Sequence, residues 1–241
     1  MKERDAVAVA DWFAPESPGG LVHAHIVQTG IGRCRVDRWP GPSTVLAELP
    51  GGNVAARGEP RVVADLAGFV QAEPEWLPVL REVDPDTAVW PRLVAVLPDP
   101  VDLPAPAHAV RRLGPDDADA LARLDASIGW VWGTWGGPAG LAASGTAWAA
   151  FDGPRLVSLA CSFFLGRDYE DIGVVTDPHH RGHGLASACA TALVGEIRAR
   201  GRRPTWTTSP DNAASLSISA RLGFVRVRED ALYAVHTPIP S

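Results

Sequence analysis

The stretch that decides the fold is Val174-Val-Thr-Asp-Pro-His-His-Arg-Gly-His-Gly-Leu-Ala186. Its first three residues are β-branched and favour an extended strand, which Pro178 ends because proline has no N–H for the ladder. Gly182 and Gly184 then open a helical pattern over residues 185–200. Alternate glycines let the backbone approach a ligand, and the free N–H groups of a first helical turn attract negative charge. The stretch predicts a strand, a phosphate-binding turn and a helix.

The motif differs from two common phosphate-binding fingerprints. No Gly-Lys-Ser/Thr follows it, and the third glycine of the dinucleotide fingerprint is absent. The run His179-His-Arg-Gly-His-Gly184 resembles the loop of the GCN5-related N-acetyltransferases (GNAT), which carry Gln/Arg-x-x-Gly-x-Gly/Ala where they bind the pyrophosphate of acetyl-CoA. Both glycines match, and His179 stands where Gln or Arg is usual. The alternative is that the glycines serve only tight packing.

A second part of the resemblance lies downstream, in Asp211-Asn-Ala-Ala-Ser-Leu-Ser-Ile-Ser-Ala-Arg-Leu-Gly-Phe224. This run is similar to the family's helix that begins with N-x-x-A/S and ends with LGF. Asn212 stands where the family's asparagine faces the cofactor, and Ser215 where it has a small residue. The wording is closest to the subgroup that includes the zwittermicin-resistance acetyltransferases.

The resemblance implies an α/β (α+β) acyltransferase fold and acetyl-CoA as the acyl donor. It implies transfer of the acetyl group to the amine of a small molecule by direct attack in a ternary complex. Two alternatives stay open, a peptide or protein N-acetyltransferase and a catalytically weak acyl-CoA-binding sensor. The predicted cofactor-binding residues are Val174, Val175, Thr176, His179, His180, Arg181, Gly182, His183, Gly184, Leu185, Ala186, Asn212 and Ser215.

The general base of the family is commonly a Glu at the start of the fourth strand. Tyr169-Glu-Asp-Ile-Gly-Val-Val-Thr176 offers Glu170 and Asp171 there, and only one can face the cleft because side chains alternate along a strand. We expect Glu170 to be the base, with Asp171 as the alternative, although both could be ordinary solvated carboxylates. The fourth strand is expected to splay from the fifth, leaving a main-chain N–H next to Val175 as the oxyanion donor.

The usual general acid is missing. The family's tyrosine lies four residues before the glycine of LGF, and this position is Ser219. A proton for the thiolate must come from elsewhere, with Tyr233 and Tyr169 the only tyrosines in the chain, or from solvent. We therefore assign Tyr233 as a candidate catalytic residue.

Three tryptophans crowd the segment Trp130-Val-Trp-Gly-Thr-Trp-Gly-Gly-Pro138. In the resembling family this region contributes to the acceptor pocket. Trp130, Trp132 and Trp135 are predicted to line such a pocket or a lid, or else to pack a short helix against the sheet.

Composition and charge exclude several classes of protein. The 241 residues are 46% hydrophobic and 21% charged, without an apolar run of membrane-spanning length, so we expect a cytoplasmic protein with no membrane partner. Residues 1–105 hold 9 basic and 15 acidic side chains, whereas residues 108–241 hold 13 of each. This balance argues against nucleic acid and hints at a cationic acceptor such as an aminoglycoside or polyamine. A homodimer stays open.

Neither cysteine nor histidine spacing predicts a metal. Cys34, Cys161 and Cys189 are few and far apart, which is typical of small buried hydrophobes. His23 and His25 would share a strand face but have no third ligand nearby. The three histidines of the glycine loop are expected to neighbour phosphate, so no metal is assigned.

The chain is predicted to form two units, 1–105 and 108–241, separated by the proline-rich linker Pro98–Ala107. Within the first unit the pattern predicts strands over 34–39, 44–49 and 92–97 and helices over 7–13, 63–71 and 77–83. This order is compatible with a degenerate copy of the acetyltransferase fold. No Gly-x-Gly loop occurs in it, and no cofactor is assigned to it. In the second unit we expect a hairpin across Asp152-Gly153 and a strand over 204–209.

Overall fold

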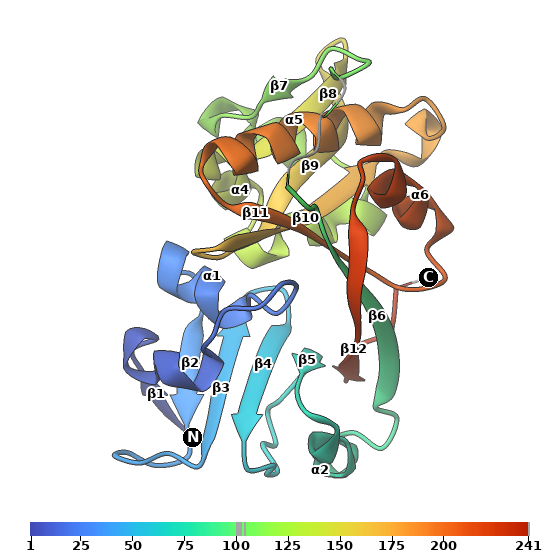
Figure 1. The fold of residues 1–241 in the computed structure, drawn as a ribbon. Coiled ribbons are helices and arrows are strands. Elements are labelled where there is room, and N and C mark those ends of the chain that lie inside the picture. The colour runs from blue at the N-terminus through green and yellow to red at the C-terminus, as the bar shows by residue number, and fades with distance from the viewer. Residues whose placement is uncertain (100–102, 104, 241) are drawn as a thin grey trace.

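The computed structural model describes residues 1–99, 103 and 105–240 (Figure 1). The predicted linker Pro98–Ala107 therefore lies partly outside the described residues. The strands that are described join one sheet in the order β1-β2-β3-β4-β5-β12-β6-β11-β10-β9-β8-β7.

The strands are β1 Lys2–Arg4, β2 Arg33–Val36, β3 Thr44–Leu49, β4 Asn53–Gly58, β5 Gly68–Gln71, β6 Ala88–Val96, β7 Arg111–Arg112, β8 Ala147–Asp152, β9 Arg155–Leu165, β10 Tyr169–Thr176, β11 Arg203–Thr208 and β12 Val225–Val235. The α-helices are α1 Val22–Thr29, α2 Leu77–Val83, α3 Ala118–Ala122, α4 Pro138–Ser144, α5 Leu185–Ala199 and α6 Ala213–Arg221. The 3₁₀ helices are η1 Val7–Phe13, η2 Pro74–Trp76, η3 Pro115–Asp117, η4 Ala126–Trp135 and η5 Pro178–His180.

The sheet contains one arrangement of strands twice. β2, β3 and β4 form an antiparallel meander and β5 lies parallel to β4; β8, β9 and β10 form the same meander and β11 lies parallel to β10. This repetition supports the expectation that the N-terminal unit is a degenerate copy of the acetyltransferase fold.

The two halves exchange their last strands. β6, which follows the N-terminal half in sequence, pairs antiparallel with β11, whereas the C-terminal strand β12 pairs antiparallel with β5. β6 and β12 also pair with each other and join the halves, as their long vertical course in Figure 1 shows. The predicted boundary at residue 105 therefore does not divide the sheet. A buried strand has the same sequence pattern whichever half of the sheet it joins, so the sequence does not reveal this exchange.

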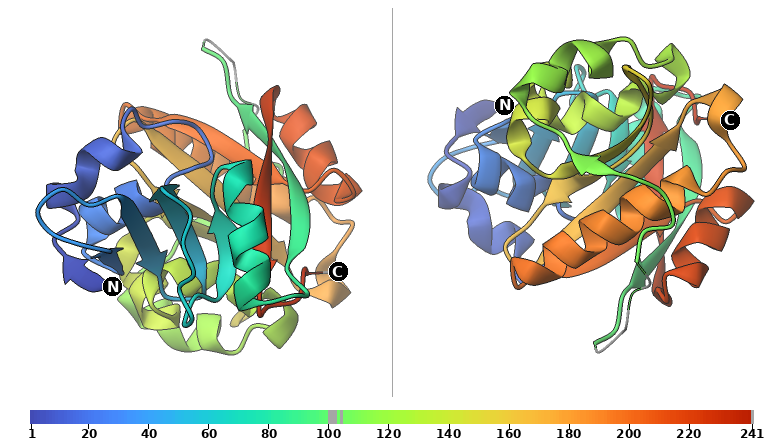
Figure 2. Two further views of the ribbon diagram at one scale, coloured as in Figure 1. Left: turned by 90° about the horizontal axis from the view of Figure 1, so that it is seen from below. Right: turned by 90° about the horizontal axis from the view of Figure 1, so that it is seen from above.

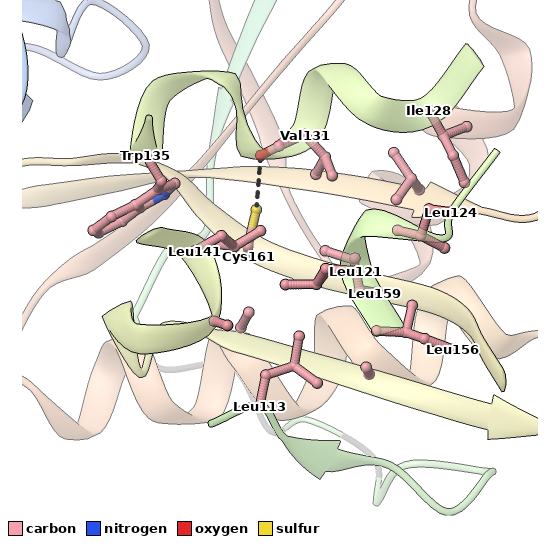
Figure 3. Packing of buried hydrophobic residues seen from close by; sticks show 14 residues of the cluster. Leu113, Leu121, Leu124, Ile128, Val131, Trp135, Leu141, Leu156, Leu159 and Cys161 are labelled. Carbon is pink, nitrogen blue, oxygen red and sulfur yellow. Dashed lines mark hydrogen bonds between the residues drawn. The ribbon is translucent and has the colours of Figure 1, made fainter. Parts of the chain in front are cut away.

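Two layers of helices cover the C-terminal half of the sheet. α5 lies across one face of β8 to β11, with α6 beside it (Figure 2), and both contribute to a core with Trp206 and Phe224. On the opposite face, α3, η4 and α4 bury a second core that includes Leu121, Val131 and Leu159 (Figure 3).

Most predicted elements are confirmed, and two are wrong. Residues 68–71 form strand β5 and not the end of a helix over 63–71. Val63 and Leu66 lie on irregular backbone and pack in the same core cluster as Trp76. His23 and His25 lie on α1 and not on a strand. His25 is fully buried between the halves, where its ring contacts Thr134 O at 3.0 Å and accepts the Leu165 N–H. Burial lowers its pKa to about 4.

Candidate active site

The glycine loop joins β10 to α5 as predicted. Gly182 and Gly184 have φ of +82° and +79°, values that favour glycine, and α5 begins at Leu185 directly after them. A Cβ on Gly182 would meet no atom within 4 Å, so open space lies beside the loop. The N–H groups of residues 185–187 have no partner inside the helix and are free to bind an anion. The loop therefore fits the pyrophosphate of acetyl-CoA.

The carboxylate of Asp177 fixes the start of this loop through hydrogen bonds and an ion pair. Its buried carboxylate accepts the His179 N–H at 2.9 Å, contacts His180 Nδ1 at 3.2 Å and pairs with Arg155 at 2.6 Å. The hydrogen bond from His180, followed by the one from the His179 backbone, lowers the pKa of Asp177. His180 Nε2 also lies 3.5 Å from Asp152, so its ring sits between two carboxylates.

His180 is thus a structural member of the loop, which corrects its assignment to the phosphate. Both of its ring nitrogens face carboxylates of the protein itself. His179, Arg181 and His183 are exposed, and their role toward phosphate stays a prediction.

The splay between the fourth and fifth strands of the C-terminal half is confirmed. Parallel pairing of β10 with β11 covers Tyr169↔Arg203, Glu170↔Pro204 and Asp171↔Thr205 and then stops, although both strands continue. β10 stays paired with β9 as far as Thr176. The β11-facing main chain of Val174 to Thr176 therefore lies along an opening that begins beside Asp171.

α6 is anchored to β11 by residues that were predicted to bind the cofactor. Asn212 caps the helix by accepting the Ser215 N–H at 3.0 Å, and Ser215 Oγ accepts Trp206 Nε1 at 2.8 Å. A cavity of about 250 Å³ lies between α6 and the strands, with Trp206, Ser219 and Phe224 in its lining. Ser219 is buried there, at the position where the family usually has its tyrosine.

Glu170 is not placed to act as the base. Its side chain is fully buried; Oε2 accepts Arg200 at 2.7 Å and the hydroxyl of Ser162, and Oε1 accepts Arg202 at 3.1 Å. These partners are donors from the end of α5 and the strands beside it. The prediction that Glu170 faces the acceptor is therefore wrong, because the carboxylate is saturated by an internal ion-pair network.

Replacing Glu170 with glutamine is expected to destabilise the protein by about 3 kcal/mol, since two arginines lose a buried carboxylate. Urea unfolding would measure the loss, and Glu229→Gln, at an ion pair whose side chain is 75% exposed, is the matched control. The folded variant should keep its affinity for acetyl-CoA. A loss of turnover without a loss of stability would contradict this role.

Asp171 occupies the opposite face of the sheet from α5. Thr205 and Thr207 donate to its Oδ1 at 2.7 and 2.9 Å, and no described residue donates to Oδ2. The residue is 4% exposed, and burial raises its pKa to about 6 against the pull of the two threonines, Arg92 and Arg228. A buried carboxylate with one free oxygen and a pKa near neutrality has the properties of a general base.

Tyr233 lies elsewhere. It is buried in a cluster with Trp76 and Leu80 of the N-terminal half and pairs with Val70 of β5. This place corrects its assignment as a catalytic residue, because β12 carries it into the pairing with β5 of the N-terminal half and not beside the glycine loop.

The three tryptophans do not gather in one pocket. Trp135 is 7% exposed, donates to Ser162 O at 2.9 Å and belongs to the core on the η4 side of the sheet (Figure 3). Trp132 packs against the same core, whereas Trp130 is 49% exposed and stacks edge-on against Phe163. Trp135 is thus a core residue, which corrects its assignment to the acceptor pocket, and only Trp130 is largely open to a ligand.

Thr205, Thr207 and Arg92 are the residues that sequence reasoning missed. Arg92 donates to Thr207 O at 3.1 Å, next to the carboxylate of Asp171. Threonines in a strand are ordinary sheet formers, and a single arginine in β6 carries no motif, so only the strand order could reveal them.

The fold and the glycine loop are those expected of an acyltransferase, and comparisons with known proteins agree. The family model described as GNAT acetyltransferase matches residues 106–233. A protein of Streptomyces virginiae, described as an uncharacterized N-acetyltransferase in the mutA 5′ region, is 42% identical over 199 residues, which cover 78% of this chain and 84% of the relative. The chain belongs to the GNAT acetyltransferase family and is an N-acetyltransferase.

Solved structures show the same fold over nearly the whole chain. A GCN5-related N-acetyltransferase-like protein of Streptococcus suis aligns with a TM-score of 0.73 at 18% identity, covering 95% of this chain and 97% of that protein. A Drosophila protein aligns with a TM-score of 0.69 at 14% identity, covering 99% and 98%. The N-terminal half is therefore part of the shared architecture.

No helix among the described residues is both long and apolar enough to cross a bilayer. No group of three or more His, Cys, Asp or Glu side chains in that part of the chain is arranged to hold a metal ion.

Proposed function

We propose that the protein transfers the acetyl group of acetyl-CoA to the amine of a small molecule, with Asp171 as the general base. The observation that carries this proposal is the position of Asp171. Its carboxylate lies where the pairing of β10 and β11 ends, at the origin of the opening that leads from the glycine loop.

The donor side of the site is formed by the loop and the splayed strand. The N–H groups after Gly184 would hold the pyrophosphate, and the free main chain of Val174 to Thr176 would hold the pantetheine arm. Bound there, acetyl-CoA supplies the activated acyl group, and a main-chain N–H next to Val175 would stabilise the oxyanion.

Asp171 would act on the acceptor from the face of the sheet opposite α5. An ammonium group cannot attack a carbonyl, so the acceptor must first lose a proton, and the free Oδ2 would take it. Gly19 of the N-terminal half packs against Thr207, and a Cβ added to this glycine would lie 3.0 Å from the threonine hydroxyl.

Direct attack by the acceptor is favoured over a covalent acyl-enzyme. Cys34, Cys161 and Cys189 are free and buried, and burial raises the pKa of each thiol, to about 12 for Cys34 and about 11 for Cys189. A nucleophilic cysteine needs an accessible thiolate, which these residues lack. Free thiols also support the cytoplasm as the site of action.

The leaving thiolate would take its proton from solvent. Tyr233 is in the N-terminal core, and the hydroxyl of Tyr169 accepts a hydrogen bond from Arg203 at the far end of β10. Ser219 donates to Leu216 O instead of facing a leaving group.

Steady-state kinetics would test this function. With a thiol-release assay and a panel of primary amines, we expect turnover that requires both substrates and initial-rate plots that intersect. Parallel plots would indicate an acyl-enzyme and contradict direct attack. Hydrolysis of acetyl-CoA without transfer to any amine would contradict the proposed reaction.

A further inference from the structure

Positive charge is buried between the two halves of this acidic protein. The face of the sheet that carries Asp171 also carries Arg92 from β6, and Arg57 of β4 lies beyond it. Both guanidinium groups are half-buried, and neither has a carboxylate within 4.0 Å among the described residues. Burial lowers the pKa of both arginines. Asp171, Asp211 and Asp230 attract Arg92, and Glu73 and Asp230 attract Arg57, without forming an ion pair with either guanidinium. A half-buried guanidinium without an ion pair can still take a carboxylate partner.

Arg92 is only partly satisfied by the protein. One terminal nitrogen donates to Thr207 O at 3.1 Å, and the group lies 4.1 Å from the ring centre of Trp90. Its Nε is buried and makes no hydrogen bond with the described residues. Because Thr207 also donates its hydroxyl to Asp171, one residue links the candidate base and this guanidinium.

Gln71 and Arg57 continue this arrangement into the N-terminal half. Gln71 donates to Asp230 at 3.3 Å, while its Oε1 is buried without a partner in the described structure. Among the described residues, Arg57 donates to main-chain oxygens alone, those of Ala56 at 2.9 Å and Gln71 at 3.3 Å. Near Asp171 the described structure thus has one buried donor without a partner, Arg92 Nε, and one buried acceptor without a partner, Gln71 Oε1.

We propose that the acceptor is an amine with a carboxylate close to it, as in an α-amino acid, and that Arg92 binds the carboxylate while Asp171 faces the amine. Arg57 would add a second positive charge at the same end. The inference rests on the proposed acetyl transfer and names its substrate class. A guanidinium matches a carboxylate with two parallel hydrogen bonds, which makes arginine the usual partner of such a group.

This local charge opposes the expectation drawn from composition. The excess of acidic residues in the N-terminal half hints at a cationic acceptor, yet a polycation would place further positive charge next to Arg92 and Arg57. Close to Arg92, the carboxylates of Asp171, Asp211 and Asp230 would attract the amine of the acceptor while the guanidinium binds its carboxylate.

The test compares acceptors that differ only in the carboxylate. The common L-amino acids, their C-terminal amides and spermidine would be assayed with the purified full chain and acetyl-CoA. We expect the best amino acid to exceed its amide in kcat/KM by about 10-fold or more. The proposal is overturned if amides are equal or better, if spermidine is preferred, or if acetyl-CoA binds and no amino acid is acetylated.

Arg92→Gln separates a specificity role from a structural one. We expect it to lower kcat/KM for the amino acid by about 10- to 100-fold, mainly through KM, and to change the value for the amide by less than about 2-fold. Arg92→Lys should recover part of the loss, and Arg81→Gln, at an exposed arginine of α2, is the control. An equal loss for both acceptors would overturn the proposal.

Failure of this inference is distinguishable from failure of the proposed function. Acetylation of amines without preference for a carboxylate would leave the acetyl transfer standing and remove only the substrate class. Absence of acetyl-CoA binding by calorimetry would remove the reaction itself.

Discussion

Replacing Asp171 with asparagine is expected to lower kcat by about 10²- to 10⁴-fold, the usual contribution of a general base. Asparagine keeps the shape of the side chain, and its amide oxygen accepts from Thr205 and Thr207 as Oδ1 does. Only the ability to take a proton is lost. The binding of acetyl-CoA, measured by calorimetry, should be unchanged.

The same variant is expected to be more stable at neutral pH. Folding raises the pKa of Asp171 from 3.8 to about 6, so the folded state holds this proton more tightly than the unfolded chain. The stability that this brings is present below pH 4 and is lost as the pH rises through 6. The asparagine side chain carries no charge to bury, so urea unfolding of Asp171→Asn at neutral pH should show a gain of about 1–3 kcal/mol.

The pH profile provides a further check on this residue. Because a carboxylate accepts a proton only when ionised, kcat/KM of the native enzyme should rise with pH and level off above about 6. The residual activity of Asp171→Asn should not show this rise with pH. Glu170→Gln is the comparison, since its carboxylate pairs with Arg200 and Arg202 on the other face of the sheet. Full activity of Asp171→Asn would refute the assignment.

Replacing both Gly182 and Gly184 with valine is expected to weaken the binding of acetyl-CoA severely, so that Kd rises by about 100-fold or more. Both residues have positive φ, which β-branched side chains adopt only with strain, so the loop must change shape. The new side chains would also enter the space beside the first N–H groups of α5, where phosphate would bind. Calorimetric titration with acetyl-CoA measures the effect.

Gly201→Val is the matched control for this double variant. Gly201 has φ of +75° and open space around it, and it follows the other end of α5. It brings a similar backbone strain about 25 Å from the loop, at 1.5 Å of rise per residue. We expect its affinity for acetyl-CoA to match that of the native protein. Retained binding by the loop variant would mean that the motif has been misinterpreted.

Local signals made the C-terminal half predictable from the sequence. β10, the glycine turn, α5, β11 and α6 follow one another where strand propensity, proline, glycine and helical spacing place them. The hairpin across Asp152-Gly153 is equally local. These features depend on neighbours within a few residues, and the glycine loop among them carried the family resemblance.

The choice between Glu170 and Asp171 required the tertiary structure. Alternation along β10 shows that they face opposite sides, but it cannot show which side α5 covers. Arg200 and Arg202, thirty or more residues further along, pair with Glu170 and leave Asp171 for the other face.

The exchange of β6 and β12 was likewise beyond the sequence. It placed Tyr233 in the wrong half for catalysis and brought Arg92 beside Asp171. Trp135 shows the same limit, because an aromatic side chain near glycines suits a pocket or a core equally well. The sequence by itself determined the local elements and the phosphate loop. Tertiary structure decided which side chains meet, because those contacts join residues far apart in the chain.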